Sequence, residues 1–200
     1  MVQTFNKFEK AILLAVAEGR TKSKSKEQNR RMAKCPEWAK VTGDHDIDLD
    51  FWGIAGEMAV AKHLNICPDL SISIAGDGGK TDLIRNNKTI QVKTNFFQGE
   101  PVLIFNQAGR NYTFKTDYAV LVSVVQDVPD SIKILGMVSQ KSYQSRKRKD
   151  SPWYEHDFGY GMRDCIAAKD LTQLKPSKYY YAQVFATAEE IKSRESLSKV

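Results

Sequence analysis

The chain has 200 residues, of which 42% are hydrophobic and 27% are charged, close to the average composition of a globular protein. This composition excludes a disordered tail or a fibrous repeat, and no apolar run approaches the roughly 18–20 residues of a membrane span. Thirty Lys and Arg against 24 Asp and Glu give a net charge of +6, which favours an anionic partner.

A first helix is predicted within residues 4–18 and ends at Gly19. Its predicted apolar stripe consists of Phe5, Phe8, Ile12, Ala15 and Val16. This helix and the segment after it form the predicted helical and basic N-terminal extension, residues 1–49. The main domain is then expected to span residues 50–200.

Two blocks of opposite charge follow the first helix. Residues 20–40 contain eight Lys or Arg and two Glu, and residues 43–50 contain four Asp. We interpret the acidic block as a solvated loop that is able to pair with the basic segment. A buried helix is then predicted over residues 51–64, with Asp50 as its N-cap, because its first eleven residues are apolar or glycine except for one Glu.

The rest of the chain has the patterns of β-strands. Residues 82–86 and 88–95 are predicted to pair as a β-hairpin around an Asn-Asn turn, because the second segment alternates with period 2. Further strands are predicted over residues 102–106, 118–126, 132–138, 165–168 and 178–185. A basic helix or loop is expected over residues 139–149, and a terminal helix over residues 187–199. The predicted fold class is α/β or α+β, with a sheet of about five strands flanked by helices.

The cysteines are three in number and widely spaced, without a C-x-x-C pair. This usage indicates neither a disulfide framework nor a zinc ribbon. The first residues include a short apolar run but neither a basic leader nor an A-x-A-like cleavage site, so we do not expect a signal peptide. We expect a reduced, cytoplasmic protein without a membrane partner.

Four polar residues stand out in this framework: Glu57, Asp82, Gln91 and Lys93. A carboxylate in an apolar helix needs a metal ion, a lysine or hydrogen-bond donors, unless Glu57 lies at the helix edge and faces solvent. Asp82 follows a glycine-rich turn, where it fits either a turn cap or a ligand. Gln91 and Lys93 share one face of their strand, while the residues beside them point to the core. A lysine in such a strand can also guard a sheet edge against aggregation.

In order and spacing these residues resemble the PD-(D/E)XK nuclease superfamily. That pattern is a helical Glu, an Asp that opens a hairpin strand, and (D/E)-x-K on the next strand. The matching pieces are Gly56-Glu57, GDGGKTDLI (76–84) and IQVKTN (90–95). The resemblance covers about residues 50–140, and DCIAAKDLTQL is similar to closing elements of phage and resolvase-like members. Gln91 stands where an acid is usual, but Q-x-K variants occur in active branches, including methyl-directed restriction enzymes.

The resemblance implies a restriction-endonuclease-like core with a central mixed sheet, and a Mg²⁺-dependent deoxyribonuclease in which Mn²⁺ can substitute. Asp82 would be the main metal ligand, Glu57 a second, and the Val92 backbone carbonyl a third. The metal would lower the pKa of a bound water and neutralise phosphate charge. Lys93 would assist the attacking water, and Gln91 would orient water or metal. The products would carry a 5′-phosphate and a 3′-hydroxyl.

Basic side chains are the expected contacts with DNA phosphates, although a solvated basic loop is the alternative for residues 141–149. These candidates are Lys80, Lys141, Arg146, Lys147, Arg148 and Lys149. Nearby aromatic residues fit either base stacking or cover of the core. They are Trp153, Tyr154, Phe158 and Tyr160. A homodimer is compatible with cuts in two strands.

Two other hypotheses remain open. The first keeps the fold without the chemistry, as a DNA-binding module with a degenerate site, and Gln91 favours it. The second is an unrelated α/β interaction protein with an accidental motif. It predicts that Glu57, Asp82 and Lys93 do not converge in space.

Overall fold

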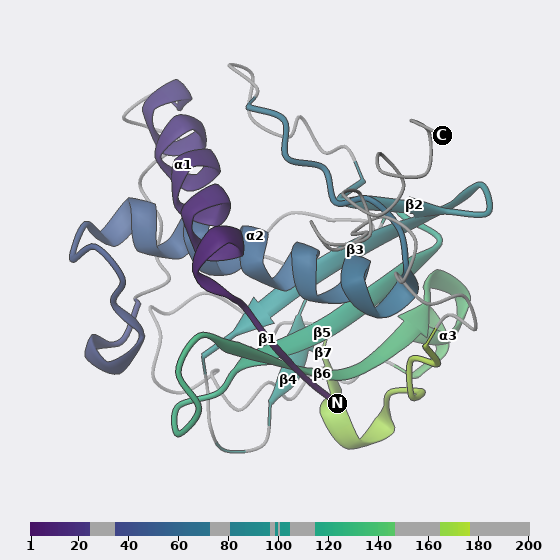
Figure 1. The fold of residues 1–200 in the computed structure, drawn as a ribbon. Coiled ribbons are helices and arrows are strands. Elements are labelled where there is room, and N and C mark those ends of the chain that lie inside the picture. Colours follow the sequence, from purple (N-terminus) through teal and green to yellow (C-terminus); the bar gives the residue numbers. More distant parts are fainter. Residues whose placement is uncertain are drawn as a thin grey trace, which may run out of the picture.

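A mixed five-stranded sheet forms the centre of the molecule (Figure 1). In the computed structural model, whose described residues are 1–24, 35–72, 81–96, 99, 101–104, 115–146 and 165–176, the strand order is β1-β6-β5-β3-β2. The strands are β1 (Val2–Thr4), β2 (Leu83–Arg85), β3 (Lys88–Asn95), β5 (Tyr118–Val124) and β6 (Ser131–Ser139). β3 and β5 are parallel, and every other neighbouring pair in this sheet is antiparallel.

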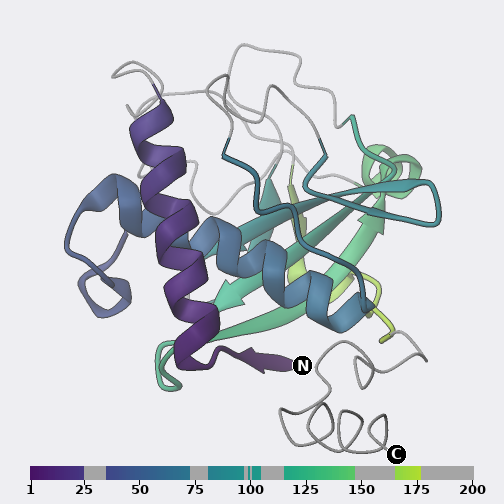
Figure 2. The same ribbon diagram turned by 45° about the horizontal axis from the view of Figure 1, so that its top comes forward.

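Two helices cover one face of this sheet. α2 (His45–Leu64) packs against the central strands, and α1 (Lys7–Ser23) crosses α2, as Figures 1 and 2 show. Shorter helical segments in the described residues are η1 (Glu37–Ala39), α3 (Gln140–Arg146) and η2 (Ala168–Asp170). The predicted α/β architecture of about five strands flanked by helices is confirmed. None of the described helices combines the length and the apolar character needed to cross a membrane.

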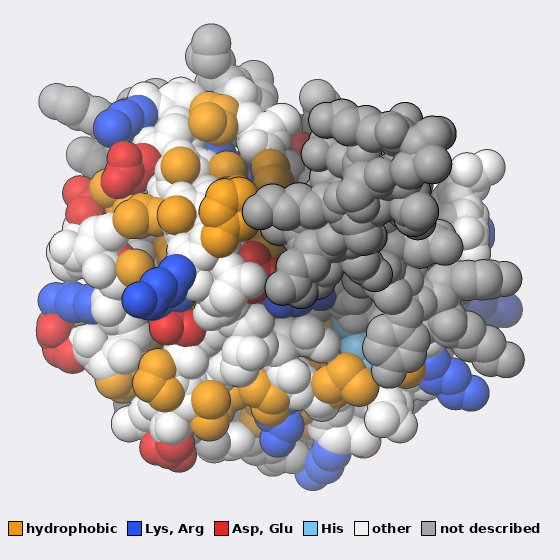
Figure 3. Space-filling view, in the orientation of Figure 1, with side chains coloured by type: hydrophobic (Ala, Val, Ile, Leu, Met, Phe, Trp, Pro, Cys, Tyr) orange, Lys and Arg blue, Asp and Glu red, His pale blue; other side chains and the backbone are white. Residues whose placement is uncertain are grey.

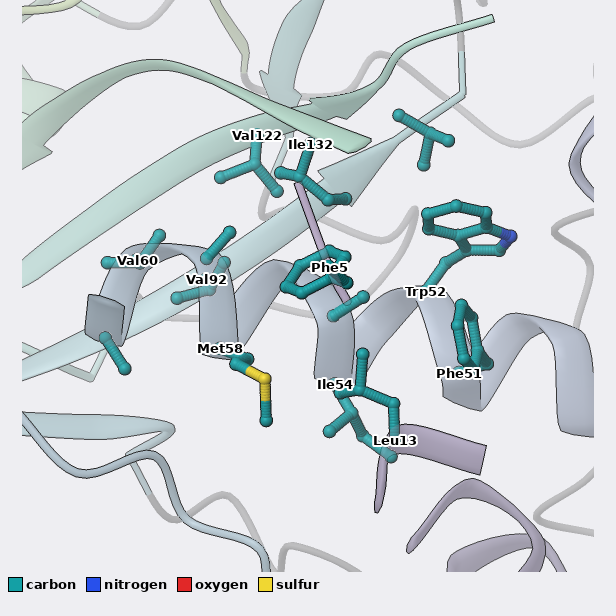
Figure 4. Close-up of a cluster of buried hydrophobic side chains, with 14 of the residues drawn as sticks. Phe5, Leu13, Phe51, Trp52, Ile54, Met58, Val60, Val92, Val122 and Ile132 are labelled. Atoms are coloured by element: carbon teal, nitrogen blue, oxygen red, sulfur yellow. The ribbon is translucent and has the colours of Figure 1, made fainter. Parts of the chain in front are cut away.

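The main core lies between these helices and the sheet. Its buried side chains include Leu13 of α1, Ile54 and Met58 of α2, and Val92 and Val122 of the sheet (Figure 4). Burial of each such side chain stabilises the fold by roughly 1.5–3 kcal/mol. α1, α2 and the β2–β3 hairpin therefore share one core, while the division at residues 49 and 50 into two parts stays a prediction.

A second, smaller core lies on the opposite face of the sheet. β4 (Val102–Ile104) and β7 (Cys165–Ala167) pair antiparallel in a separate two-stranded sheet. The buried side chains of this second core are Leu103, Ala119, Leu121, Val138, Tyr143 and Ile166. Because successive side chains of a strand point to opposite faces, β5 contributes to both cores. β4 and β7 correspond to the strands predicted over residues 102–106 and 165–168, but they lie outside the central sheet.

The first helix differs from its prediction in extent and in its buried face. α1 continues four residues beyond Gly19, Phe8 is 69% exposed and Ala15 is exposed. The buried residues of α1 are Leu13, Val16 and Ala17. Figure 3 shows hydrophobic side chains at the surface over α1. The predicted stripe starts from Phe5, which is buried but precedes the N-cap Asn6. Because Phe5 lies outside the helix, its burial does not indicate which face of α1 is buried.

The acidic block belongs to a helix and not to a solvated loop. α2 begins directly after its N-cap Asp44, whose carboxylate accepts backbone amides of the first turn, so the predicted cap at Asp50 is wrong. Asp48 is completely buried, and Asp50 is 7% exposed. The expected pairing with the basic segment does occur, because Lys24 Nζ lies 2.6 Å from Asp50 Oδ1. Acidic residues are favoured here because the N-terminal end of a helix carries positive partial charge.

The hairpin is confirmed, and β3 covers residues 88–95 as predicted. The sequence did not predict β1, which pairs with β6 at the outer edge of the sheet. Residues 70–72, the start of the segment LSISIA (70–75), form no strand. The rest of that segment, the predicted strand 178–185 and the predicted helix 187–199 lie outside the described residues.

Candidate active site

The helical acid Glu57 lies next to Gly56, where α2 and β3 approach closely. Gly56 permits this approach, because a Cβ atom there would lie 2.2 Å from Thr94 Oγ1 on β3. The Thr94 hydroxyl donates to the Trp52 carbonyl at 3.2 Å, which ties the strand to the helix backbone. The Glu57 side chain is only 15% exposed and lies 3.4 Å from Arg20 Nη1. Glu57 therefore does not face bulk solvent, and that alternative is wrong.

Glu57 and Asp82 are close enough for their charges to interact. The pKa of Glu57 is raised to about 8, mainly by burial and secondly by the negative charge of Asp82. The positive charge of Arg20 acts in the opposite direction, and Asp69 adds a smaller repulsion. Burial and a like charge both disfavour an ionised carboxylate. The fold thus brings a helical acid and a hairpin acid together, and the positive charge of Arg20 does not offset the burial and repulsion that act on Glu57.

Asp82 binds across the hairpin. It directly precedes β2, and its Oδ2 accepts the backbone amide of Val92 on β3 at 2.6 Å. The Asp82 amide donates to the Ile90 carbonyl at 3.1 Å. Strand β2 pairs with residues 88–90 of β3, so beyond Ile90 the Asp82 side chain occupies that edge of β3. A residue in a strand sends its amide and carbonyl to the same side, so the Val92 carbonyl faces this edge too.

Gln91 and Lys93 lie on one face of β3, as predicted. Their parallel partners on β5 are Ala119 and Leu121, which belong to the second core, whereas Val92 enters the main core under α2. By alternation, the side chains of Gln91 and Lys93 are directed away from α2. Both are partly buried. Asp82 therefore contacts the Val92 backbone at the edge of β3, and its charge acts on Glu57 of α2. The side chains of Gln91 and Lys93 point to the opposite face of the sheet.

The donor set around Asp82 suits a hard divalent cation. It comprises the carboxylates of Glu57 and Asp82 and the backbone carbonyl of Val92. Within the described residues, no group of three or more His, Cys, Asp and Glu side chains is arranged to hold a metal ion. Mg²⁺ typically takes one or two protein carboxylates and keeps several waters, so two carboxylates are sufficient. A cation between them would also offset the repulsion that raises the pKa of Glu57.

The predicted DNA contacts are only partly described. Lys141 is exposed on α3, and Arg146 is the last residue of that helix. The Gln140 amide donates to the Asp117 carbonyl, which places the start of α3 beside the start of β5. Outside the described residues lie Lys80, Lys147, Arg148 and Lys149, and the aromatic residues Trp153, Tyr154, Phe158 and Tyr160.

Arg20 is the residue of this site that the sequence interpretation missed. The charge pattern assigns it to the basic segment of the N-terminal extension, yet its guanidinium reaches Glu57 on α2. A signal for this position exists in the sequence. Arg20 follows Leu13, Val16 and Ala17 at the i, i+3, i+4, i+7 spacing of one helix face, and these three residues are the buried ones of α1.

Comparison with known protein families, with curated proteins and with solved structures found no match to this chain.

Proposed function

We propose that the chain is a Mg²⁺-dependent DNA endonuclease with a restriction-endonuclease-like core, in which Mn²⁺ can replace Mg²⁺. The observation that carries the proposal is the electrostatic coupling of Glu57 to Asp82, two acids 25 positions apart in the sequence. Perturbed carboxylates of this kind cluster at functional sites. The mixed sheet, the hairpin and the Q-x-K strand support the same proposal.

Each residue of the candidate site has a separate role in the proposed hydrolysis. Asp82, Glu57 and the Val92 carbonyl would hold Mg²⁺, which when bound lowers the pKa of a water and neutralises phosphate charge. Lys93 holds the attacking water and offsets the negative charge that develops on the phosphate. Gln91 is neutral and orients that water through its amide. The proposal requires Gln91 and Lys93 to act at the edge of β3 beside Val92, because their side chains lie on the face of the sheet opposite to Glu57.

DNA is the proposed substrate because of charge. The chain carries +6 overall, and each Lys or Arg that neutralises a phosphate steepens the salt dependence of binding. Exposed Lys141 on α3 is a described candidate for such a contact. Cleavage of both strands of a duplex by a homodimer, with one site for each strand, is part of the same proposal.

A second candidate function is a DNA-binding module with a degenerate site. Gln91 favours it, because an amide replaces the acid usual at that position and removes one negative charge from the metal site. This candidate predicts salt-dependent binding to DNA without cleavage under any metal condition.

Incubation with DNA and Mg²⁺ or Mn²⁺ distinguishes these functions. The substrates are linear, supercoiled, single-stranded and four-way DNA, each incubated with the unmodified chain, Asp82→Ala and Lys93→Ala. Matched controls are Asp127→Ala and Lys133→Ala, which remove an exposed acid and an exposed lysine elsewhere. We expect cleavage by the unmodified chain and by both controls, and a loss of about 10³-fold in each site variant, comparable to the removal of one electrostatic contributor at an active site.

The other outcomes have clear meanings. Binding without cleavage by the unmodified chain supports the degenerate module. Cleavage that persists in Asp82→Ala and Lys93→Ala rejects this site as its source. Ligation of the cleaved ends by a ligase tests whether the products carry 5′-phosphates and 3′-hydroxyls.

A further inference from the structure

Arg20 links the Glu57 side chain to the backbone of residues 69–71. Its Nη1 lies 3.4 Å from Glu57 Oε2, its Nη2 donates to the Asp69 carbonyl at 2.8 Å, and its Nε donates to the Ser71 carbonyl at 3.1 Å. The Arg20 side chain is only 22% exposed. Arginine suits such a position because its planar guanidinium presents donors in a fixed fork. The two backbone carbonyls set the plane of this fork, and the third contact then fixes one oxygen of Glu57.

The segment that holds Arg20 is itself held by α1. A Cβ atom at Gly19 would lie 2.4 Å from Ile72 Cδ1, so the absence of a side chain at Gly19 lets the Ile72 side chain lie directly on the helix. Helix α1 therefore binds this segment through adjacent residues, by packing at Gly19 and by hydrogen bonds at Arg20. Through Arg20, α1 therefore contributes to the candidate site together with α2 and the hairpin.

We propose that Arg20 is a positioning residue that fixes the Glu57 carboxylate in the orientation from which it shares a cation with Asp82. This inference rests on the proposed function, and it makes the N-terminal helix part of the metal site. Groups that orient a metal ligand without touching the metal strongly affect metal affinity. The 3.4 Å contact is long for a charge-assisted hydrogen bond, so it directs Glu57 without saturating it as an acceptor.

A role of Arg20 as a competing positive charge would change cation affinity in the opposite direction. If Arg20 were only a competing positive charge, its removal would strengthen cation binding, because like charges repel at short distance. If it positions Glu57, its removal weakens cation binding. The direction of the change in affinity therefore separates the two roles.

The test measures Mn²⁺ affinity at pH 8 by electron paramagnetic resonance of free Mn²⁺, together with thermal unfolding without metal. The variants are Arg20→Gln, Arg20→Lys and Glu57→Gln. The matched control is Lys10→Gln, which removes an ion pair of the same helix, that of Lys10 with Asp130 at 2.6 Å. We expect a loss of roughly 10-fold in Mn²⁺ affinity for Arg20→Gln. Arg20→Lys should fall between it and the unmodified chain, because one ammonium cannot reproduce the fork. Lys10→Gln should bind Mn²⁺ normally.

Two results overturn the inference: unchanged affinity in Arg20→Gln, or tighter binding. If Arg20→Gln does not fold, Arg20→Lys decides, and affinity equal to that of the unmodified chain rejects the positioning role. This inference alone fails if three results occur together: the unmodified chain binds Mn²⁺, Glu57→Gln abolishes that binding, and Arg20→Gln leaves it intact. When the unmodified chain binds no Mn²⁺, the proposed function fails as well.

Discussion

Two largely buried acids of the same helix differ in how their charge is balanced. Asp48 is completely buried, and its carboxylate accepts the three backbone amides and the Thr42 hydroxyl of residues 41–43. Glu57 lies further along α2, with Arg20 at 3.4 Å and a second acid, Asp82, acting against it. Burial of an acid is thus not by itself a mark of function. The acid whose charge the fold leaves incompletely balanced is the one that marks the candidate site.

Removal of the balanced acid should have the largest effect on stability. Asp48→Ala leaves the amides of residues 41–43 without their acceptor, and we expect a loss of about 3 kcal/mol in the free energy of unfolding, since hydrogen bonds to charged groups are strong. Chemical denaturation measures this loss. Asp127→Ala, at an exposed position, should stay within about 0.5 kcal/mol of the unmodified chain. A similar small loss for Asp48→Ala would show that the balanced and unbalanced acids do not differ in this way.

Replacement of Glu57, the acid whose charge is incompletely balanced, should raise the free energy of unfolding at alkaline pH. The pKa of Glu57 is raised from 4.5 to about 8, so its contribution to stability is fully present below pH 4.5 and is lost as the pH rises through 8. Glu57→Gln removes this loss. At pH 9 we expect the variant to be more stable than the unmodified chain by about 2 kcal/mol, less than the full shift implies, because a partly exposed site relaxes. Urea unfolding from pH 5 to pH 9 measures the difference.

A third acid provides the control for that pH profile. Hydrogen bonds from the Thr89 amide, the Lys88 ammonium and the Thr89 hydroxyl lower the pKa of Asp117 to about 2. Its contribution to stability is therefore present above its unfolded pKa and is lost as the pH falls toward 2. Asp117→Asn should therefore lower the free energy of unfolding by a constant amount from pH 5 to pH 9 and leave the slope of the alkaline limb unchanged. If Glu57→Gln leaves the alkaline limb unchanged, the charge of Glu57 is already balanced, and the contrast with Asp48 disappears.

The close approach of α2 to β3 should show a smaller effect. Gly56→Ala places a Cβ against Thr94 Oγ1 and Val122 Cγ2, so we expect a loss of about 1–2 kcal/mol. Gly53→Ala is the matched control on the same helix. No atom lies within 4 Å of a Cβ there, and we expect a gain of about 0.5–1 kcal/mol from better helix propensity. Addition of Thr94→Ala should recover part of the loss at Gly56, and a double-mutant cycle measures this coupling. Equal effects of the two glycine substitutions would contradict a tight contact at Gly56.

The hairpin of the candidate site could be predicted because its signals are local. Residues 88–95 alternate with period 2, and the turn residues Asn86 and Asn87 have φ of 49° and 59°, the left-handed conformation that a tight hairpin turn requires and asparagine tolerates. The burial of Glu57 stayed open, because the apolar residues around it in the helix are also compatible with a carboxylate at the helix edge that faces solvent.

The start of α2 could not be predicted, because its acidic residues depend on partners elsewhere in the chain. Asp48 is buried with residues 41–43, and Asp50 is buried with Lys24 of the segment after α1. Because these partners are not evident from the sequence, a run of aspartates predicts a solvated loop, since an unpaired carboxylate is costly to bury. The error in the phase of α1 has a similar origin, because the burial of Phe5 depends on tertiary packing before the helix begins.

The sequence by itself determined the α/β class, the hairpin and the candidate residues Glu57, Asp82, Gln91 and Lys93, because periodicity and turn chemistry act over a few residues. Only the tertiary structure decided that Asp82 reaches the Val92 amide, that its charge raises the pKa of Glu57, and that Arg20 joins the site from α1. These relations depend on the distance between side chains remote in the chain, and packing of helices on the sheet sets that distance.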